Sequence, residues 1–187
     1  MTTRVNDIQF RIATANGTGS QSANLILLRS LFDMGVHVSG KNMFPSNISG
    51  LPTWFLVRVS EQGYQAPADD THIHVLMNKA TWMEDLEEAE EGSVVIFNAD
   101  VKLPVDRDDV IQVPVPMTTM ARTLNAKLAR MLANVIYVGV IAELIGIDTA
   151  ALGNAIDLQF KGKSSAIDLN TQAAELGREW VRDNHKK

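Results

Sequence analysis

Residues 13–35 constrain the fold of this chain more than any other segment. A short apolar run ends in the turn of residues 15–20, Ala-Asn-Gly-Thr-Gly-Ser, and an apolar helix is expected over residues 21–34. Gly17 and Gly19 let backbone N–H groups approach a ligand, and a helix N-terminus adds a positive partial charge. A strand, a small-residue turn and a helix in this order predict a site for a phosphate or carboxylate. A ligand-free structural turn is the alternative.

The remaining chain alternates apolar runs with turns and helical patterns. Strands are expected over residues 8–12, 36–38, 54–59, 73–77, 93–97 and 110–115, and helices over 80–91 and 119–146, the latter kinked at Gly139. Residues 39–53 are rich in turn formers and predict a long loop. We therefore predict an α/β fold: a three-layer α/β/α sandwich with a mostly parallel sheet, a helical C-terminal third and one domain over residues 1–187.

Composition narrows the function classes. The chain has 187 residues, a formal net charge of -5 and no cysteine. The acidic balance argues against nucleic-acid binding, and the absence of thiols excludes disulfides and cysteine-held iron–sulfur clusters on this chain. The most apolar window, Val135 to Ala142, is far shorter than the roughly 20 residues of a membrane-spanning helix. We expect a cytoplasmic protein that binds neither nucleic acid nor membrane.

Two loops are expected at the carboxyl edge of the sheet, where ligands of α/β proteins bind. The candidate anion contacts are Gly17, Thr18, Gly19 and Ser20 in the first turn and Ser46 and Asn47 in the loop of residues 39–53. Lys41 is a weaker candidate. The turn is neither G-x-G-x-x-G, because position 22 is Ser22, nor a P-loop. Helix capping by the serines and an ordinary surface loop are the alternatives.

Other titratable clusters favour structural roles. His72 and His74 share one strand face, but no third metal ligand follows at suitable spacing, so packing is favoured. The acidic run of residues 84–91 lacks the spacing of a calcium loop and predicts a solvated helix face. No nucleophile–base pair is recognisable. We assign this chain no catalytic residue and no metal ligand.

The order of short segments along the chain is similar to that of a known family. The segments are Gly17-Thr18-Gly19, Ser22-Ala23, Gly35-Val36-His37-Val38, Phe44-Pro45-Ser46, Gly50, residues 73–78 and 92–97, Val113-Pro114-Val115-Pro116, Phe160-Lys161-Gly162-Lys163 and Leu169-Asn170. They resemble the gamma subunit or domain of the 2-oxoacid:ferredoxin oxidoreductases, which include the pyruvate, 2-oxoglutarate, 2-oxoisovalerate and indolepyruvate enzymes.

Two departures resemble one branch of that family. The family turn is usually Gly-x-Gly-Gly-Gln-Gly, and here Thr14 and Asn16 stand at its first two glycines. The family often has Arg-Gly-Gly in the next loop, where this chain has Ile48-Ser49-Gly50. The branch fuses gamma ahead of the alpha domain and is commonly called the alpha subunit of 2-oxoglutarate oxidoreductase.

The resemblance implies a function within a larger enzyme. That enzyme decarboxylates a 2-oxoacid on thiamine diphosphate with magnesium, passes electrons through iron–sulfur clusters to ferredoxin, and transfers the acyl group to coenzyme A. Its alpha and thiamine-binding beta parts are the expected partners. This chain has no cysteine and no Gly-Asp-Gly element for thiamine diphosphate. Alone it is expected to bind no cofactor and to be inactive, scaffolding the complex and contacting coenzyme A.

Two other interpretations remain open from the residues. One is a stand-alone nucleotide-binding module of Rossmann type, which the missing third glycine and the lack of an acidic residue after the second strand disfavour. The other is a purely structural interaction domain, with Trp54, Phe55 and the loop of residues 43–48 as its contact surface.

Overall fold

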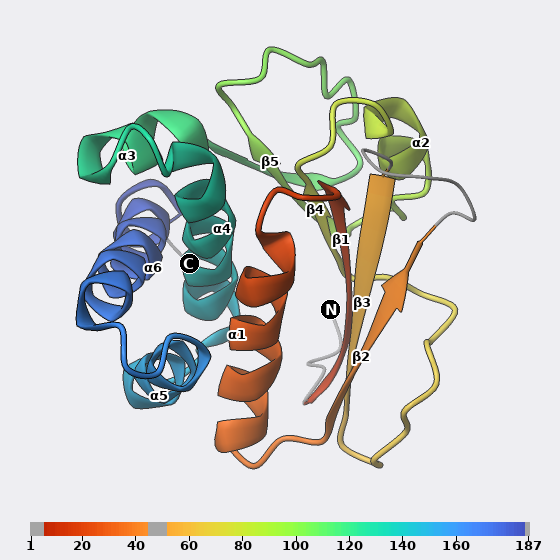
Figure 1. Ribbon diagram of the computed structural model, residues 1–187. Coiled ribbons are helices and arrows are strands. Elements are labelled where there is room, and N and C mark those ends of the chain that lie inside the picture. Colours follow the sequence, from red (N-terminus) through yellow and green to blue (C-terminus); the bar gives the residue numbers. More distant parts are fainter. Residues whose placement is uncertain (1–5, 45–51, 186–187) are drawn as a thin grey trace. The chain divides into compact units, whose positions relative to one another are not determined.

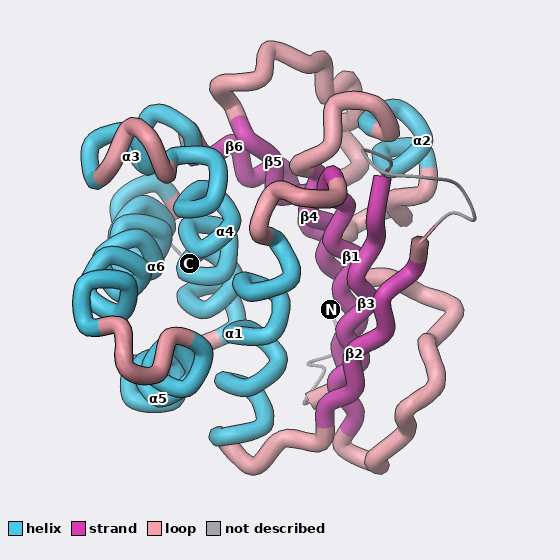
Figure 2. Tube along the Cα trace, viewed as in Figure 1, coloured by secondary structure: helices cyan, strands magenta, loops and turns pink. Residues whose placement is uncertain are grey.

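The computed structural model describes residues 6–44 and 52–185, and the chain divides into two units of internal contacts. The sheet unit comprises Met1–Gly17 and Val36–Val115, and the helical unit comprises Thr18–Gly35 and Pro116–Lys187. Strands belong to the first unit and most helices to the second (Figure 1, Figure 2). That residues 1–187 form one domain stays a prediction.

The sheet unit contains a six-stranded mixed sheet. Its strands are β1 (Asp7–Ala15), β2 (Val38–Met43), β3 (Pro52–Ser60), β4 (Ile73–Leu76), β5 (Val94–Asn98) and β6 (Ile111–Val115), in the spatial order β2-β3-β1-β4-β5-β6. The β1–β4, β4–β5 and β5–β6 pairs are parallel, whereas β3 runs antiparallel to both β1 and β2. The α/β class is confirmed. The β2–β3 connection is too short for a helical crossover, which is why this pair is antiparallel.

The predicted loop of residues 39–53 is wrong at both ends. Residues 39–43 continue strand β2 instead of leaving it, and β3 begins at Pro52. Strand β2 lies at the sheet edge, and its residues from Gly40 to Met43 are exposed. Because residues 40–43 are exposed on both faces of the strand, this part of β2 lacks the alternating pattern by which strands are recognised.

The two faces of the sheet differ in chemistry because successive side chains alternate. One face is apolar and fully buried at Phe10, Ile12 and Val57. The opposite face has buried polar side chains, including Gln9, Arg58 and His74. An apolar cluster lies on the same side of the sheet as these polar side chains. It consists of Leu76, Trp82, Leu86, Ala89, Val95, Phe97 and Val110.

Helix α2 (Trp82–Glu87) is much shorter than the predicted helix over 80–91. Arg107 donates hydrogen bonds to the carbonyls of Leu86 and Ala89, at 3.0 and 2.9 Å, and so satisfies backbone acceptors that a longer helix would use itself. The neighbouring like charges of residues 84–91 further disfavour helix extension.

The helical unit contains five helices among its described residues. They are α1 (Ser20–Asp33), α3 (Met117–Leu124), α4 (Ala129–Ile145), α5 (Thr149–Gln159) and α6 (Ser164–Asn184). The predicted helix over 119–146 is therefore two helices, α3 and α4, bent by 115°. The break is at Asn125, whose side-chain oxygen accepts hydrogen bonds from the N–H groups of Lys127 and Leu128. Such local bonds compete with helical ones.

Helix α4 is buried almost all round and lies beside α6 (Figure 1). Gly139 does not kink α4. It lets the two backbones meet, since a Cβ atom there would lie 1.9 Å from the carbonyl oxygen of Ala174. The reciprocal glycine is Gly177 on α6, where a Cβ atom would lie 2.2 Å from the oxygen of Ile136.

Among the described residues, none of the helices is by itself long and apolar enough to cross a membrane, although the bent pair of α3 and α4 meets that length and composition when taken together.

Replacing either interface glycine by alanine is expected to destabilise the protein. The added methyl group would overlap backbone that cannot rotate away, and overpacking of this kind costs about 1–3 kcal/mol, more than the roughly 0.5–1 kcal/mol that removing a helical glycine returns. Urea denaturation of Gly139→Ala and Gly177→Ala should show lower midpoints. Gly153→Ala on α5 is the matched control, because nothing lies within 4 Å of its Cβ position. It should be neutral or stabilising, and three equal midpoints would contradict the packing.

Candidate functional site

The turn before α1 has the backbone conformation expected of an anion site. Gly17 and Gly19 have φ angles of 79° and 80°, a region that other residues adopt only with strain. Gly19 is also the N-cap of α1, and no side chain caps this helix. The N–H groups of the first helical turn of such a helix are natural partners of an anion.

Side chains of α4 hold the second half of this turn. The Asn134 amide donates a 2.9 Å hydrogen bond to the carbonyl oxygen of Thr18. The Met131 side chain reaches within 3.3 Å of the position that a Cβ atom on Gly19 would occupy. Thr18 and Ser20 are both buried.

Arg130 is a cation on the same face of α4 that the sequence alone did not identify as a candidate. Arg130 precedes Asn134 by four residues, a spacing that places two side chains one above the other on a helix. Arg130 is exposed and forms no ion pair within the described part of the chain. Asn134 bonds to Thr18, so Arg130 shares the face of α4 that carries this contact. The turn at Asn125 could have pointed to Arg130 in the sequence, because it implies that a new helix, α4, begins just before this residue.

The structure describes only some of the contacts predicted in the loop after β2. Register pairs join Met43 of β2 with Trp54 of β3, and Trp54 with Ala13 of β1, so β1 and β2 end at the same edge of the sheet. Lys41 is an exposed residue of β2. Ser46 and Asn47 lie outside the described residues.

The predicted solvated acidic face is wrong for one residue. Asp85 is buried and accepts hydrogen bonds from Trp54 Nε1 at 2.6 Å and from Thr81 Oγ1 at 2.5 Å. Arg11 Nε lies 3.8 Å from its carboxylate, while Arg11 Nη2 pairs with Glu88 at 2.6 Å. A carboxylate this deep is tolerated because both of its oxygens have partners.

His74 is the most perturbed group on the polar face of the sheet. Burial and the neighbouring Arg11 guanidinium lower its pKa from 6.5 to about 4, with smaller contributions in the same direction from Arg107 and His72 and an opposing one from the Thr71 backbone. His74 therefore stays neutral at pH 7. His72 accepts a 3.0 Å hydrogen bond at Nδ1 from the Gln9 N–H. No set of three or more metal-ligating side chains converges within the described chain.

The fold is that of gamma subunits of oxoacid oxidoreductases. The gamma subunit of a keto/oxoacid ferredoxin oxidoreductase from Geobacter sulfurreducens superimposes with a TM-score of 0.78 at 16% identity, covering 94% of this chain and 99% of its own. A 2-oxoglutarate:ferredoxin oxidoreductase from Magnetococcus marinus, with 2-oxoglutarate, coenzyme A and succinyl-CoA bound, superimposes with a TM-score of 0.87 at 20% identity, covering 98% of this chain and 32% of that chain.

Residues 9–180 match the pyruvate ferredoxin/flavodoxin oxidoreductase family, and the chain belongs to it. The ketoisovalerate oxidoreductase subunit VorA of Methanothermobacter thermautotrophicus is 26% identical over 181 residues. Subunit alpha of 2-oxoacid:ferredoxin oxidoreductase 2 from Aeropyrum pernix is 21% identical. Each alignment covers 95% of this chain, but only 37% and 34% of the relatives. The resemblance seen in the sequence is confirmed, and this chain spans about a third of these relatives.

The unfolding free energy is expected to fall as the pH drops from 6.5 towards 4. In that interval the unfolded chain binds a proton that folded His74 does not, which amounts to about 3 kcal/mol over the whole interval. Urea denaturation at several pH values measures this slope. His74→Leu should flatten it, whereas His37→Gln, at an exposed histidine, should not. An unchanged slope in His74→Leu would contradict the assignment.

Proposed function

We propose that this chain is the gamma-type part of an enzyme that oxidatively decarboxylates a 2-oxoacid to an acyl-CoA. Support comes from the family match over residues 9–180 and from relatives that are subunits of 2-oxoacid:ferredoxin oxidoreductases. The enzyme would assemble from this chain with alpha and thiamine-binding beta parts, work in the cytoplasm, and use ferredoxin as electron acceptor.

The chain's own residues limit its share of the chemistry. It has no cysteine, and no metal-ligating set occurs within its described residues, so iron–sulfur clusters do not fit here and belong to its partners. Thiamine diphosphate and its magnesium are likewise assigned to the beta part. What this chain offers is a scaffold and a place for an anion.

We assign that place to phosphate groups of coenzyme A, which supplies the thiol that accepts the acyl group. The observation that carries the assignment is the start of α1, where Gly19 is the N-cap and no side chain caps the helix. Backbone N–H groups of the first turn would donate to phosphate oxygens, and Arg130 would add the positive charge. Asn134 and Met131 keep the turn in place through Thr18 and Gly19. These residues bind and orient the substrate, while bond making belongs to the partner parts.

Replacing Arg130 by alanine is expected to raise the KM for coenzyme A of the assembled enzyme by tenfold or more and to leave kcat unchanged. A charged hydrogen bond to phosphate is worth about 1.5–3 kcal/mol, and about 1.4 kcal/mol corresponds to tenfold. Steady-state kinetics with coenzyme A and with its form lacking the 3′-phosphate would show which phosphate is held, because a variant that has lost one partner no longer distinguishes the two.

Lys102→Ala is the matched control. It also removes an exposed cation, but one that belongs to the sheet unit, whereas Arg130 belongs to the helical unit. Its KM should be that of the unchanged enzyme. Equal KM values in both variants would contradict the coenzyme A assignment and favour the purely structural role. Calorimetry of the isolated chain with NAD tests the stand-alone nucleotide-binding alternative, which requires measurable heat.

A further inference from the structure

The segment between β5 and β6 forms an extended strap over α2. Its side chains alternate, with Leu103 and Val105 packed against the apolar cluster of the sheet unit and Pro104 and Asp106 exposed. Trp82 Nε1 donates a 3.0 Å hydrogen bond to the Pro104 carbonyl, which fastens the strap to the first residue of α2. The strap therefore has a defined conformation despite its lack of regular secondary structure.

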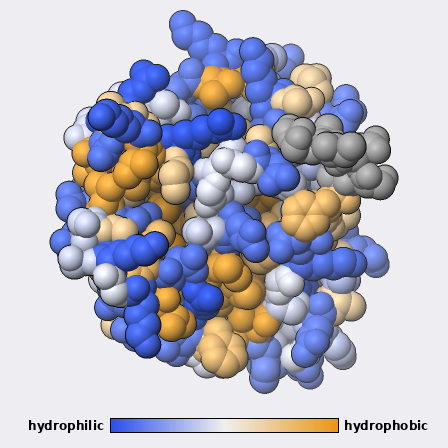
Figure 3. All heavy atoms as spheres, viewed as in Figure 1, coloured by the Kyte–Doolittle hydropathy of each residue, from blue (hydrophilic) through white to orange (hydrophobic). Residues whose placement is uncertain are grey.

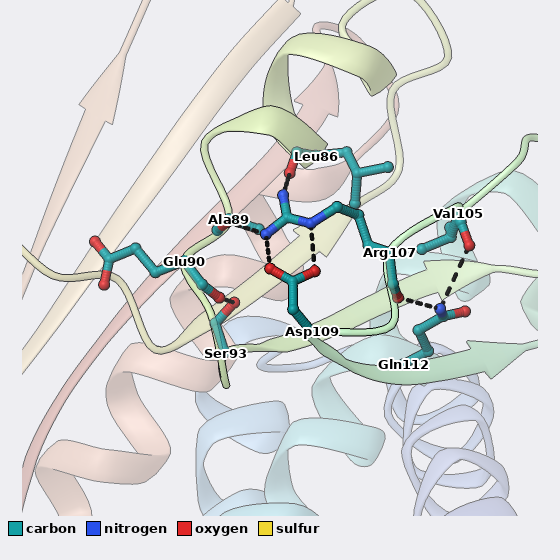
Figure 4. A network of polar contacts seen from close by, with 8 residues as sticks. All are labelled: Leu86, Ala89, Glu90, Ser93, Val105, Arg107, Asp109 and Gln112. Atoms are coloured by element: carbon teal, nitrogen blue, oxygen red, sulfur yellow. Dashed lines mark hydrogen bonds and ion pairs between the residues drawn. The ribbon is translucent and has the colours of Figure 1, made fainter.

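Arg107 fixes the other end of the strap (Figure 4). Its guanidinium donates to the backbone carbonyls of Leu86 and Ala89 and forms two 2.6 Å hydrogen bonds with Asp109. The Gln112 amide donates to the Arg107 carbonyl at 2.7 Å. These bonds pre-organise the space between α2 and the strap, and they neutralise the one cation that lines it.

That space is a small apolar groove of about 140 Å³. It is lined by Met83, Leu86, Glu87, Pro104, Asp106 and Arg107. Small-molecule sites usually measure about 300–1,000 Å³, so the groove suits one side chain better than a cofactor. Met83 is 57% exposed, and a solvent-exposed methionine adapts readily to an incoming apolar group.

The charge around the groove is strongly one-sided. Residues 82–109 contain ten carboxylates and only two cations, Lys102 and Arg107. Glu87 and Asp106, at the rim, are exposed and form no ion pair within the described chain. Elsewhere, hydrophobic residues come to the visible surface in separate patches among hydrophilic ones (Figure 3). Here an apolar anchor point and an excess of negative charge coincide.

We propose that this groove docks a partner polypeptide through an apolar side chain flanked by lysines or arginines. The apolar side chain would fill the space between Met83, Leu86 and Pro104, where burial contributes most of the affinity. The flanking cations would face Glu87 and Asp106, which steer association and select the partner. A purely apolar partner would leave these carboxylates to be desolvated without compensation. The proposal is independent of the coenzyme A assignment.

The test uses the whole chain and a short synthetic peptide in which a leucine pair is flanked by lysines. NMR titration at low salt should shift the Met83 methyl resonance and the amides of α2 and the strap. The double charge reversal Glu87→Lys with Asp106→Lys should weaken binding at least tenfold. The matched reversal Asp157→Lys with Asp168→Lys, at exposed carboxylates of α5 and α6, should change it far less. Met83→Ser should weaken binding, and Met34→Ser, at another exposed methionine, should not.

Three results would overturn the proposal. A peptide with serines in place of leucines that binds equally well would show a general attraction to negative charge. Equal effects of the two charge reversals would show that the groove is not the site. Self-association of the chain that is lost in Met83→Ser, without peptide binding, would identify a second copy as the occupant.

Discussion

The close approach of α4 and α6 is the constraint on which the helical unit depends. Helices normally pack at 8–10 Å, with side chains between them, but here Gly139 and Gly177 face the partner helix's backbone carbonyls directly. This contact fixes the position of α4 along its length. Helix α4 in turn presents Asn134 and Met131 to the start of α1, and Tyr137 donates a 2.7 Å hydrogen bond to Asn24 of α1. The conformation of the glycine turn therefore depends on helix packing well away from it.

Much of the architecture follows from the spacing of apolar residues along the sequence and from the turn-forming residues between them. The alternation at Ile8, Phe10 and Ile12, the glycine turn and the apolar pattern after it predict α1 within one residue at each end and β1 within one residue at its start and three at its end. Strand β1 is recognisable because its apolar side chains alternate with polar ones, and α1 because one of its faces is buried and the other is not. The same reasoning fails for β2, whose edge position leaves both faces exposed.

The parts that the sequence could not predict depend on single side chains acting at a distance. The break between α3 and α4 results from one asparagine, Asn125, within an otherwise continuous helical pattern. Asp85 looks like its glutamate neighbours, and only the fold brings Trp54 and Thr81 to it. Arg130 becomes a candidate only when α4 is known to lie beside α1. The glycine turn was predicted from local sequence, whereas its charged neighbour required tertiary structure.

Charge is distributed unevenly between the two units, and this distribution fits two kinds of partner. The sheet unit holds fourteen of the twenty-two carboxylates, whereas the helical unit has a small excess of cations. A polyanion such as coenzyme A suits the start of α1 with Arg130, and a basic polypeptide suits the acidic groove at α2.

The central claim is the proposed binding of coenzyme A phosphates at the start of α1. A structure of the assembled enzyme with coenzyme A bound tests it directly: the account predicts phosphate oxygens within hydrogen-bond distance of the first-turn N–H groups of α1 and of Arg130. A coenzyme A whose phosphates contact only the partner subunits would contradict it.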